Sequence, residues 1–218
     1  MTTVAIIVAA GKGNRAGGKV PKQWRKIAGK LVADWSINAF KNHSLVDFVI
    51  VVLPPNKKLH RTDVMTCTGG KSRSLSVYNG LLAAKSLSPN KVLIHDVARP
   101  AVTEETITDI INAINDETGA APGLPIIDAI WKISKGEIEK TLDRDFIFRA
   151  QTPQGFPFSK ILEAHEEESD KRAFDDVELA KKFGLKVILK TGHKDNIKIT
   201  TPNDFLKISK ILVKKFRR

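Results

Sequence analysis

Hydrophobic residues along this chain follow two alternating periods. Short apolar runs, largely β-branched, occupy residues 4–8, 48–53, 92–94 and 187–189, and such runs are typical of strands buried inside a sheet. Between them, apolar residues recur every three or four positions, which is the spacing of one buried helix face. This second period predicts helices near residues 31–41, 74–86, 104–115, 159–168 and 176–183, with a last helix after Pro202.

The alternation of strand and helix predicts an α/β fold. Strand–helix–strand units make neighbouring strands parallel, and right-handed crossovers distribute the helices over both faces of the sheet. Ligands in such sheets bind at the carboxyl ends of the strands. Functional residues are therefore expected directly after the predicted strands.

The alternation is interrupted at about residues 129–148. The stretch AIWKISKGEIEKTL alternates apolar and polar residues around Lys135 and Gly136, which predicts a two-stranded hairpin. An isolated hairpin is only marginally stable in water, so we expect this one to pack on a second subunit and make a homodimer. The alternative is an antiparallel edge of the main sheet. The expected organisation is one domain over residues 1–218 with this insertion.

The charge of the chain restricts its partners. The 36 Lys and Arg residues exceed the 24 Asp and Glu residues, which leaves a net charge of +12. Such a balance fits either a nucleic-acid surface or an enzyme that handles phosphorylated substrates. The basic residues are dense only at residues 12–30 and at the C-terminal end, without the interleaved aromatic residues on which single strands stack, so we expect no nucleic acid.

Membrane and secretion signals are not found in the sequence. No apolar run approaches the roughly 18 residues that a membrane span needs. The N-terminal residues match neither a signal peptide nor a transit peptide, and Cys67 is the only cysteine. We expect a cytoplasmic protein without disulfides and without a membrane partner.

A glycine-rich loop follows the first predicted strand. Gly11, Gly13, Gly17 and Gly18 allow sharp turns and a close approach of the backbone to a ligand, and free N–H groups at such a turn can converge on an anion. Positive side chains surround the loop, which favours a polyphosphate. They are Lys12, Arg15, Lys19 and Lys22.

Two common phosphate-binding motifs do not match this loop. The dinucleotide fingerprint G-x-G-x-x-G requires glycine where the chain has Ala16. The P-loop pattern G-x-x-x-x-G-K-[ST] fits from Gly13 to Lys19, but Val20 stands where a magnesium-binding hydroxyl is needed. The basic residues favour a phosphate site of another class, and the alternative is that the glycine-rich segment is only a turn between strand and helix.

Other strand ends add residues to the predicted site. Asp96 follows the strand at residues 92–94, where a carboxylate can bind Mg²⁺ or a ribose hydroxyl, although it could instead cap a helix, a place that Thr103 fills better. Gly69 and Gly70 precede a helix and would let a base approach closely. Further residues after predicted strands are Arg99, Arg144, Thr152 and Lys198, and the three basic ones make the cleft cationic.

Seven ordered motifs give a specific resemblance. They are AAGKGNR, PKQW, GGKSRSLSV, HDVARP, LDR, QTPQGF and DNIKIT, and they span nearly the whole chain. In this order they resemble the methylerythritol-phosphate cytidylyltransferases of the non-mevalonate isoprenoid pathway. The resemblance implies a Rossmann-like, mostly parallel twisted sheet with helices on both faces and a protruding β-arm that clasps a second subunit. It also implies transfer of a cytidylyl group from CTP, with Mg²⁺, to 2-C-methyl-D-erythritol 4-phosphate, with release of pyrophosphate.

The resemblance also implies a role for each matching residue. The triphosphate would be wrapped by the phosphate loop, with Lys22 on the α-phosphate; the loop residues are Ala10, Gly11, Gly13 and Arg15. Gly70 and Ser76 would face the cytosine, and Asp96 would lie on the ribose and metal side. The substrate phosphate would be held by Arg99, Arg144, Thr152 and Lys198. Among these, Arg15, Lys22, Arg144 and Lys198 would be the catalytic cations.

The chain departs from the family pattern at three positions. Lys71 stands where an acidic residue is usual, and Ala129 and Phe174 each replace a threonine. The resemblance implies that these positions lie around the base and the substrate phosphate. Two alternatives to the main interpretation are therefore kept: a cytidylyltransferase for another polyol phosphate such as ribitol 5-phosphate, and a non-catalytic basic module that binds nucleotides or nucleic acid.

Overall fold

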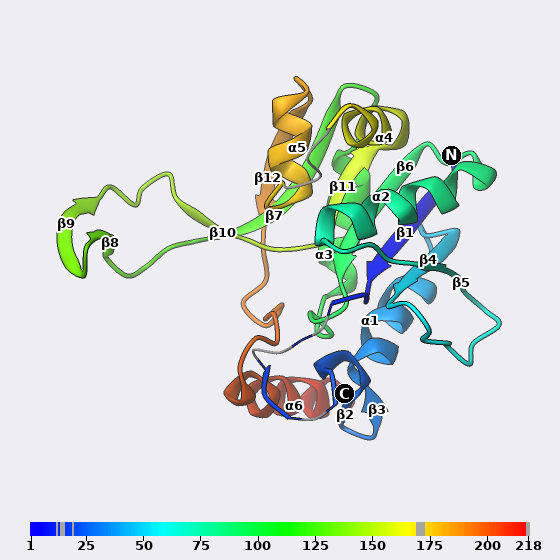
Figure 1. The fold of residues 1–218 in the computed structure, drawn as a ribbon, viewed down its shortest axis with the longest axis horizontal. Coiled ribbons are helices and arrows are strands. Elements are labelled where there is room, and N and C mark those ends of the chain that lie inside the picture. The colour runs from blue at the N-terminus through cyan, green and yellow to red at the C-terminus, as the bar shows by residue number, and fades with distance from the viewer. Residues whose placement is uncertain (12, 14–15, 19, 169–172, 217–218) are drawn as a thin grey trace.

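The computed structural model describes residues 1–11, 13, 16–18, 20–168 and 173–216, and Arg15 lies outside them. Its main sheet follows the order β10-β7-β11-β6-β1-β4-β5, with β12 also paired to β7 (Figure 1). The strands of this sheet are β1 (Thr3–Val8), β4 (Phe48–Leu53), β5 (Met65–Thr68), β6 (Lys91–Asp96), β7 (Thr118–Pro125), β10 (Phe148–Ala150), β11 (Gln154–Pro157) and β12 (Lys186–Thr191).

Helices connect several of these strands in sequence. The helices are α1 (Val32–Lys41), α2 (Arg73–Ala84), α3 (Glu104–Ala113), α4 (Phe158–Glu167), α5 (Asp176–Lys182) and α6 (Pro202–Phe216). Strand β5 follows β4 directly, and α5 follows α4. The described elements outside the arm also include the 3-10 turns η2 (Lys22–Trp24) and η3 (Lys85–Leu87) and a short hairpin of β2 (Lys26–Ile27) and β3 (Lys30–Leu31). The predicted mostly parallel α/β sheet is confirmed, because β1 pairs in parallel with both β4 and β6.

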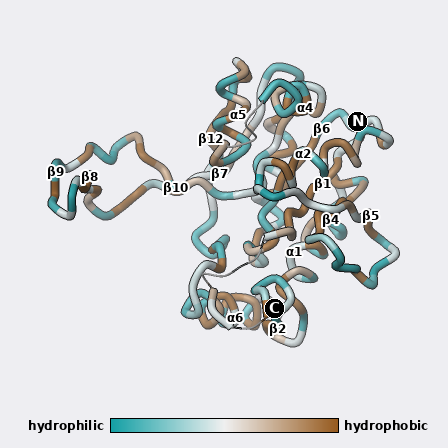
Figure 2. Tube along the Cα trace, viewed as in Figure 1, coloured by the Kyte–Doolittle hydropathy of each residue, from teal (hydrophilic) through white to brown (hydrophobic). Residues whose placement is uncertain are grey.

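Alternate residues of the central strands pack on opposite faces of the sheet. Ala5 and Ile7 of β1 face a cluster that contains α1 and α3, whereas Val4 and Ile6 face α2, α4 and α5. A third cluster joins α6 to Ile27 and the segment after β6. Figure 2 shows hydrophobic residues concentrated in the central strands and the helices against them.

The second half of the sheet differs from the expected parallel pattern. Strands β11 and β10 run antiparallel to their neighbours, and β7 was not predicted from its sequence TGAAPGLP. Glycine and proline are poor strand formers, so the sequence of β7 did not indicate a strand. Glycine is nevertheless required at two places, because Phe156 packs against Gly119 in β7 and Ile110 packs against Gly155 in β11. Strand β5 was also missed, since its side chains are largely exposed and lack an apolar run.

The predicted hairpin is present and is separate from the main sheet. Strands β8 (Ile130–Ser134) and β9 (Glu137–Leu142) form their own two-stranded antiparallel sheet, which projects from the body (Figure 1). The alternative of an antiparallel edge strand holds only for β10, which pairs with β7 at the base of this arm. Hereafter, the arm means residues 126–147.

Among the described residues, no helix has the length and apolar character needed to cross a membrane.

Candidate active site

The glycine-rich loop follows the carboxyl end of β1 and contacts β4 and η2. The Ala9 N–H donates to the Val52 carbonyl at 2.9 Å, which continues the pairing of β1 with β4. Gly13 has a φ of +70°, and a Cβ there would lie 3.2 Å from the Lys22 backbone nitrogen. This position therefore favours glycine for both its conformation and its close contact with η2.

Lys22 connects the loop to the last loop of the fold. Its Nζ donates to the Ile199 carbonyl at 2.6 Å, although 177 residues separate the two. Ile199 is next to Lys198, so the lysine predicted for the α-phosphate and the lysine predicted for the substrate phosphate meet on one segment. Arg15, predicted beside them, lies outside the described residues.

The loop at residues 69–72, predicted to lie beside the cytosine, is bonded to the side chain of Ser76. Ser76 is buried; its Oγ accepts from the Gly70 N–H at 3.1 Å and donates to the Ser72 carbonyl at 2.8 Å. A Cβ at Gly69 would come within 2.4 Å of the Ala10 side chain, so this loop touches the phosphate loop. Gly70 and Ser76 therefore lie beside the glycine-rich loop, and the Ser76 hydroxyl is bonded to backbone groups.

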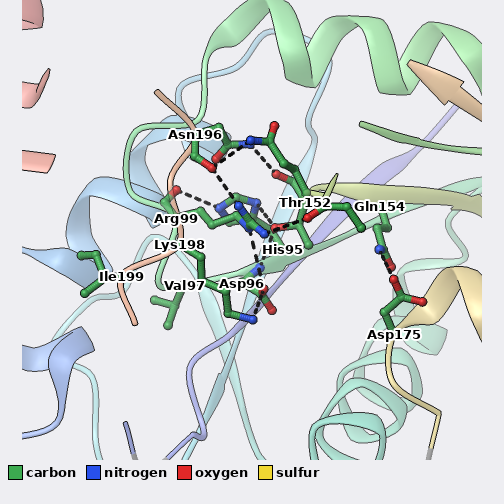
Figure 3. Close-up of polar contacts among 12 residues, drawn as sticks. His95, Asp96, Val97, Arg99, Thr152, Gln154, Asp175, Asn196, Lys198 and Ile199 are labelled. Atoms are coloured by element: carbon green, nitrogen blue, oxygen red, sulfur yellow. Dashed lines mark hydrogen bonds and ion pairs between the residues drawn. The ribbon is translucent and has the colours of Figure 1, made fainter. Parts of the chain in front are cut away.

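Asp96 lies at the end of β6 among three cations. Its Oδ2 is 2.7 Å from Lys198 Nζ and 3.9 Å from Arg99 Nε, while its Oδ1 is 3.2 Å from Arg73 Nε (Figure 3 shows the side with Lys198 and Arg99). Burial opposes ionisation, but Arg73, Lys198 and Arg99 outweigh it and hold the pKa of Asp96 well below its usual range. Asp96 is therefore an anion that orients the surrounding cations.

Arg73 carries the charge network away from this edge. Its Nη1 lies 2.8 Å from Asp176 Oδ2, and Asp176 Oδ1 lies 3.5 Å from His165 Nε2. Burial opposes the positive charge, yet Asp176 and Asp96 raise the pKa of Arg73 above its ordinary value. This side chain ties the start of α2 to β6 and α5, and the sequence analysis assigned it no role although it stands in the GGKSRSLSV motif.

Arg99 connects the two loops that flank the end of β6. Its two terminal nitrogens donate to the Asn196 carbonyl at 2.8 Å and the Ala150 carbonyl at 3.1 Å (Figure 3). Asn196 in turn donates to the Thr152 carbonyl at 2.8 Å. These bonds hold the segments before β11 and after β12 against the end of β6.

Thr152 and His95 complete this arrangement. The Asp96 N–H donates to Thr152 Oγ1 at 3.1 Å, and the same hydroxyl lies 3.0 Å from His95 Nδ1. His95 Nε2 lies 3.1 Å from the Arg99 carbonyl, so this nitrogen carries the proton and Nδ1 accepts from Thr152. Burial lowers the pKa of His95 to about 3, which keeps the ring neutral at pH 7.

Arg144 lies away from this cluster in its own chain. It is exposed in the arm, and its Nη1 donates to the Ile127 carbonyl. The arm extends away from the sheet edge that carries Asp96 (Figure 1). The structure thus brings together Asp96, Arg99, Thr152 and Lys198 but not Arg144.

The residues around Asp96 are poorly suited to hold a metal. Among the described residues, no group of three or more His, Cys, Asp and Glu side chains could bind one. Both Asp96 oxygens already face cations, and a divalent ion requires several oxygen ligands. The assignment of Mg²⁺ to Asp96 remains a prediction that this charge arrangement opposes.

Thr103 caps α3, as predicted, by accepting from the Thr106 N–H.

Comparisons with known proteins agree with this geometry. A family model described as 2-C-methyl-D-erythritol 4-phosphate cytidylyltransferase (IspD) matches residues 3–214. The protein of that name from Roseobacter denitrificans is 42% identical over 217 residues, which cover 97% of each chain. The crystal structure of the Francisella tularensis protein of that name has a TM-score of 0.83 at 27% identity, covering 97% of this chain and 100% of the other.

Some relatives are much longer than this chain. The bifunctional enzyme IspD/IspF of Ruegeria sp. (strain TM1040) is 45% identical over 217 residues, which are 97% of this chain and 56% of that protein. The chain thus spans little more than half the length of such bifunctional relatives.

Proposed function

This chain belongs to the 2-C-methyl-D-erythritol 4-phosphate cytidylyltransferase family, and we propose that it transfers a cytidylyl group from CTP to 2-C-methyl-D-erythritol 4-phosphate. The products would be 4-diphosphocytidyl-2-C-methyl-D-erythritol and pyrophosphate. The contact of Lys22 Nζ with the Ile199 carbonyl supports the proposal most directly, because it joins the turn after the glycine-rich loop to the segment that carries Lys198. The two phosphates that react must meet where these two lysines lie.

The reaction needs no general base. An oxygen of the substrate phosphate is already anionic, and it attacks the α-phosphorus of CTP. A P–O bond forms there, and the bond to the β-phosphate breaks as pyrophosphate leaves with the electron pair. Negative charge gathers around the α-phosphorus, so the proposed catalysis consists of positioning and electrostatic stabilisation by Lys22, Arg15 and Lys198.

Asp96 contributes by fixing the cations rather than by taking a proton. Because its pKa is held low, Asp96 stays ionised and holds Lys198 Nζ at 2.7 Å from its Oδ2. We propose that Lys198, Arg99, Thr152 and Arg144 surround the substrate phosphate, and that Gly70 and Ser76 hold the loop on which the cytosine lies. Ala10, Gly11 and Gly13 would supply the backbone of the triphosphate site.

Magnesium belongs to the substrate in this proposal. A triphosphate binds Mg²⁺ in solution, so the ion would enter as the CTP complex, and no step is assigned to a metal held by the chain. The proposed enzyme is a cytoplasmic homodimer, and its single domain over residues 1–218 and its location remain predictions. The dimer is supported by the exposed apolar side chains of the arm.

Pyrophosphate release tests the function directly. The chain is incubated with magnesium and CTP, alone or with 2-C-methyl-D-erythritol 4-phosphate or ribitol 5-phosphate. We expect release only with the first polyol phosphate, and slower release when UTP replaces CTP, since backbone groups near Gly70 would read the cytosine. Release with ribitol 5-phosphate alone would support the related cytidylyltransferase instead. Release with neither would overturn the enzymatic assignment.

A further inference from the structure

Gln23 is a buried amide in the turn that carries Lys22. Its side chain is 1% exposed, and its Nε2 donates to the Ala9 carbonyl at 2.9 Å and to the Gly11 carbonyl at 2.6 Å. Both hydrogens of the amide are therefore used on the first residues of the phosphate loop. The orientation of the amide follows from these partners, since its oxygen would repel two carbonyl oxygens at the same place.

These two bonds determine the direction in which the loop peptides point. In a trans peptide, the carbonyl of one residue and the N–H of the next point in opposite directions. With the Ala9 carbonyl turned toward Gln23, the Ala10 N–H points away from it, toward the side on which an anion would lie. The amide also keeps the carbonyl lone pairs of Ala9 and Gly11 away from a phosphate, which they would repel.

The same residue connects the loop to the lysine. Gln23 Oε1 lies 3.5 Å from the place of a Cβ on Gly13, so the loop passes directly over this side chain. Lys22 precedes Gln23 in η2 and reaches the Ile199 carbonyl. A change at Gln23 would therefore shift the loop N–H groups and the Lys22 ammonium relative to each other.

We propose that Gln23 is a positioning residue that holds the triphosphate loop in its anion-binding conformation. The proposal rests on the proposed function for the identity of the nucleotide, but binding of a polyphosphate does not require turnover. Gln23 contacts carbonyl groups of the loop and not the reacting atoms. Its contribution is the arrangement of groups that the resemblance assigns to CTP.

Two substitutions separate the donor role of Gln23 from its volume. Gln23→Met keeps a side chain of similar length without donors, and Gln23→Glu keeps the shape but places a carboxylate against two carbonyls. Binding of inorganic tripolyphosphate is measured by calorimetry, and kcat and KM for CTP are measured where turnover occurs. We expect the tripolyphosphate Kd and the KM for CTP to rise about tenfold or more in both variants at pH 8.

The pH dependence of Gln23→Glu distinguishes positioning from general damage to the fold. The introduced carboxyl is buried beside oxygen acceptors, so it takes up a proton as the pH falls, and the protonated form regains one donor. We expect tripolyphosphate affinity to recover severalfold between pH 8 and pH 6 in Gln23→Glu, relative to the same pH change in Gln23→Met. Equal pH profiles of the two variants would contradict the proposal.

A second glutamine provides the matched control. Gln154 is also 1% exposed and uses its amide on Asp175 Oδ2 at 2.9 Å and the Asp176 N–H at 3.1 Å, away from the phosphate loop. Gln154→Met should lower the free energy of unfolding by a similar amount yet leave the tripolyphosphate Kd within about twofold. A similar loss of tripolyphosphate affinity in both methionine variants would overturn a specific role for Gln23.

A measurement on the unchanged chain covers the case in which the variants do not fold. The sequence has three glutamines, Gln23, Gln151 and Gln154, so their side-chain NH₂ signals can be followed by NMR during a tripolyphosphate titration. We expect the largest shift at Gln23. An unshifted Gln23 signal at saturation would refute the inference, whereas Gln23-dependent binding without turnover would refute only the enzymatic function.

Discussion

Polar groups are buried at the end of β6 around Asp96, whereas in the arm they are exposed. At the sheet edge, Asp96 and Arg99 are buried, and each charged group faces an opposite charge or a carbonyl of the same chain. In the arm, Arg144 is exposed, and so are apolar side chains that a monomer would normally bury. Phe146 is 91% exposed, and Trp131 is 55% exposed.

The difference indicates which part of the site one chain completes alone. Buried charges are stable only when their partners are already in place, so the Asp96 cluster is organised before any ligand binds. The polar contacts of the arm, such as that of Arg144 with the Ile127 carbonyl, are exposed to solvent, and its exposed apolar face is typical of a surface that another protein covers. We therefore expect the sheet edge to work in cis and the arm in trans.

The largest expected effect comes from removing a cation beside the phosphate loop. Lys22→Ala and Arg15→Ala should each lower kcat by about 100- to 1,000-fold, or roughly 3 to 4 kcal/mol, because each removes a positioned charge from the transition state. Urea unfolding should change little. Lys207→Ala on the exposed face of α6 serves as the control. Near-normal turnover of Lys22→Ala would rule out the role given to Lys22.

Mixed dimers test whether Arg144 works in trans. Lys22→Ala and Arg144→Ala chains, each inactive alone, are unfolded together and refolded. Random pairing makes about half of the dimers mixed, and each mixed dimer has one intact site of two, so activity should return to roughly one quarter of the unchanged protein. If no activity returns although mass spectrometry verifies mixed dimers, Arg144 belongs to the site of its own chain or to none.

Charge placed on the apolar face of the arm should weaken the dimer. Trp131→Lys replaces a half-exposed aromatic side chain in β8, and we expect the dimer dissociation constant in analytical ultracentrifugation to rise about thirtyfold, or roughly 2 kcal/mol. Lys135→Asn at the hairpin turn, where φ is +50°, controls for altered arm charge. An unchanged dissociation constant for Trp131→Lys would exclude this face from the interface.

The smallest effect concerns the pH stability of the sheet edge. Burial lowers the pKa of His95 from 6.5 to about 3, so between these values the unfolded chain binds a proton that the folded chain does not. Stability is therefore lost as the pH falls from about 6.5, by at most about 1.4 kcal/mol per pH unit. The low pKa of Asp96 adds a further loss only as the pH falls below about 4.

Urea unfolding at pH 7 and pH 5 measures this slope. His95→Asn should reduce the loss of stability between the two pH values by about 1 to 2 kcal/mol relative to the unchanged chain. His60→Asn, on an exposed loop, should leave it unaltered. The prediction fails if His95→Asn and the unchanged chain lose the same free energy.

Local patterns in the sequence were enough to predict three central strands of the sheet and the helices that pack on them. The apolar runs of β1, β4 and β6 and the amphipathic helices between them are set by short-range periodicity, and the glycine loop follows β1 as expected. The hairpin of β8 and β9 was also predicted from strict alternation around Lys135 and Gly136. The sequence motifs indicated the family, the position of Asp96 at the end of β6 and the position of Lys198 in the loop after β12.

Tertiary structure decided the features that depend on partners far along the chain. Strands β7, β10 and β11 form although their sequences are rich in Gly, Pro or exposed residues, because neighbouring strands supply their hydrogen bonds. The charges around Asp96 come from residues 73, 99 and 198, and no periodicity reports which of them will meet. Gln23 stood in a motif without a role, since only the folded loop brings the Ala9 and Gly11 carbonyls onto its amide. Short-range hydrophobic patterns therefore determined most of the helices and strands. The contacts of the buried polar groups were determined by tertiary structure, because a buried donor or charge needs a partner that can lie anywhere along the chain.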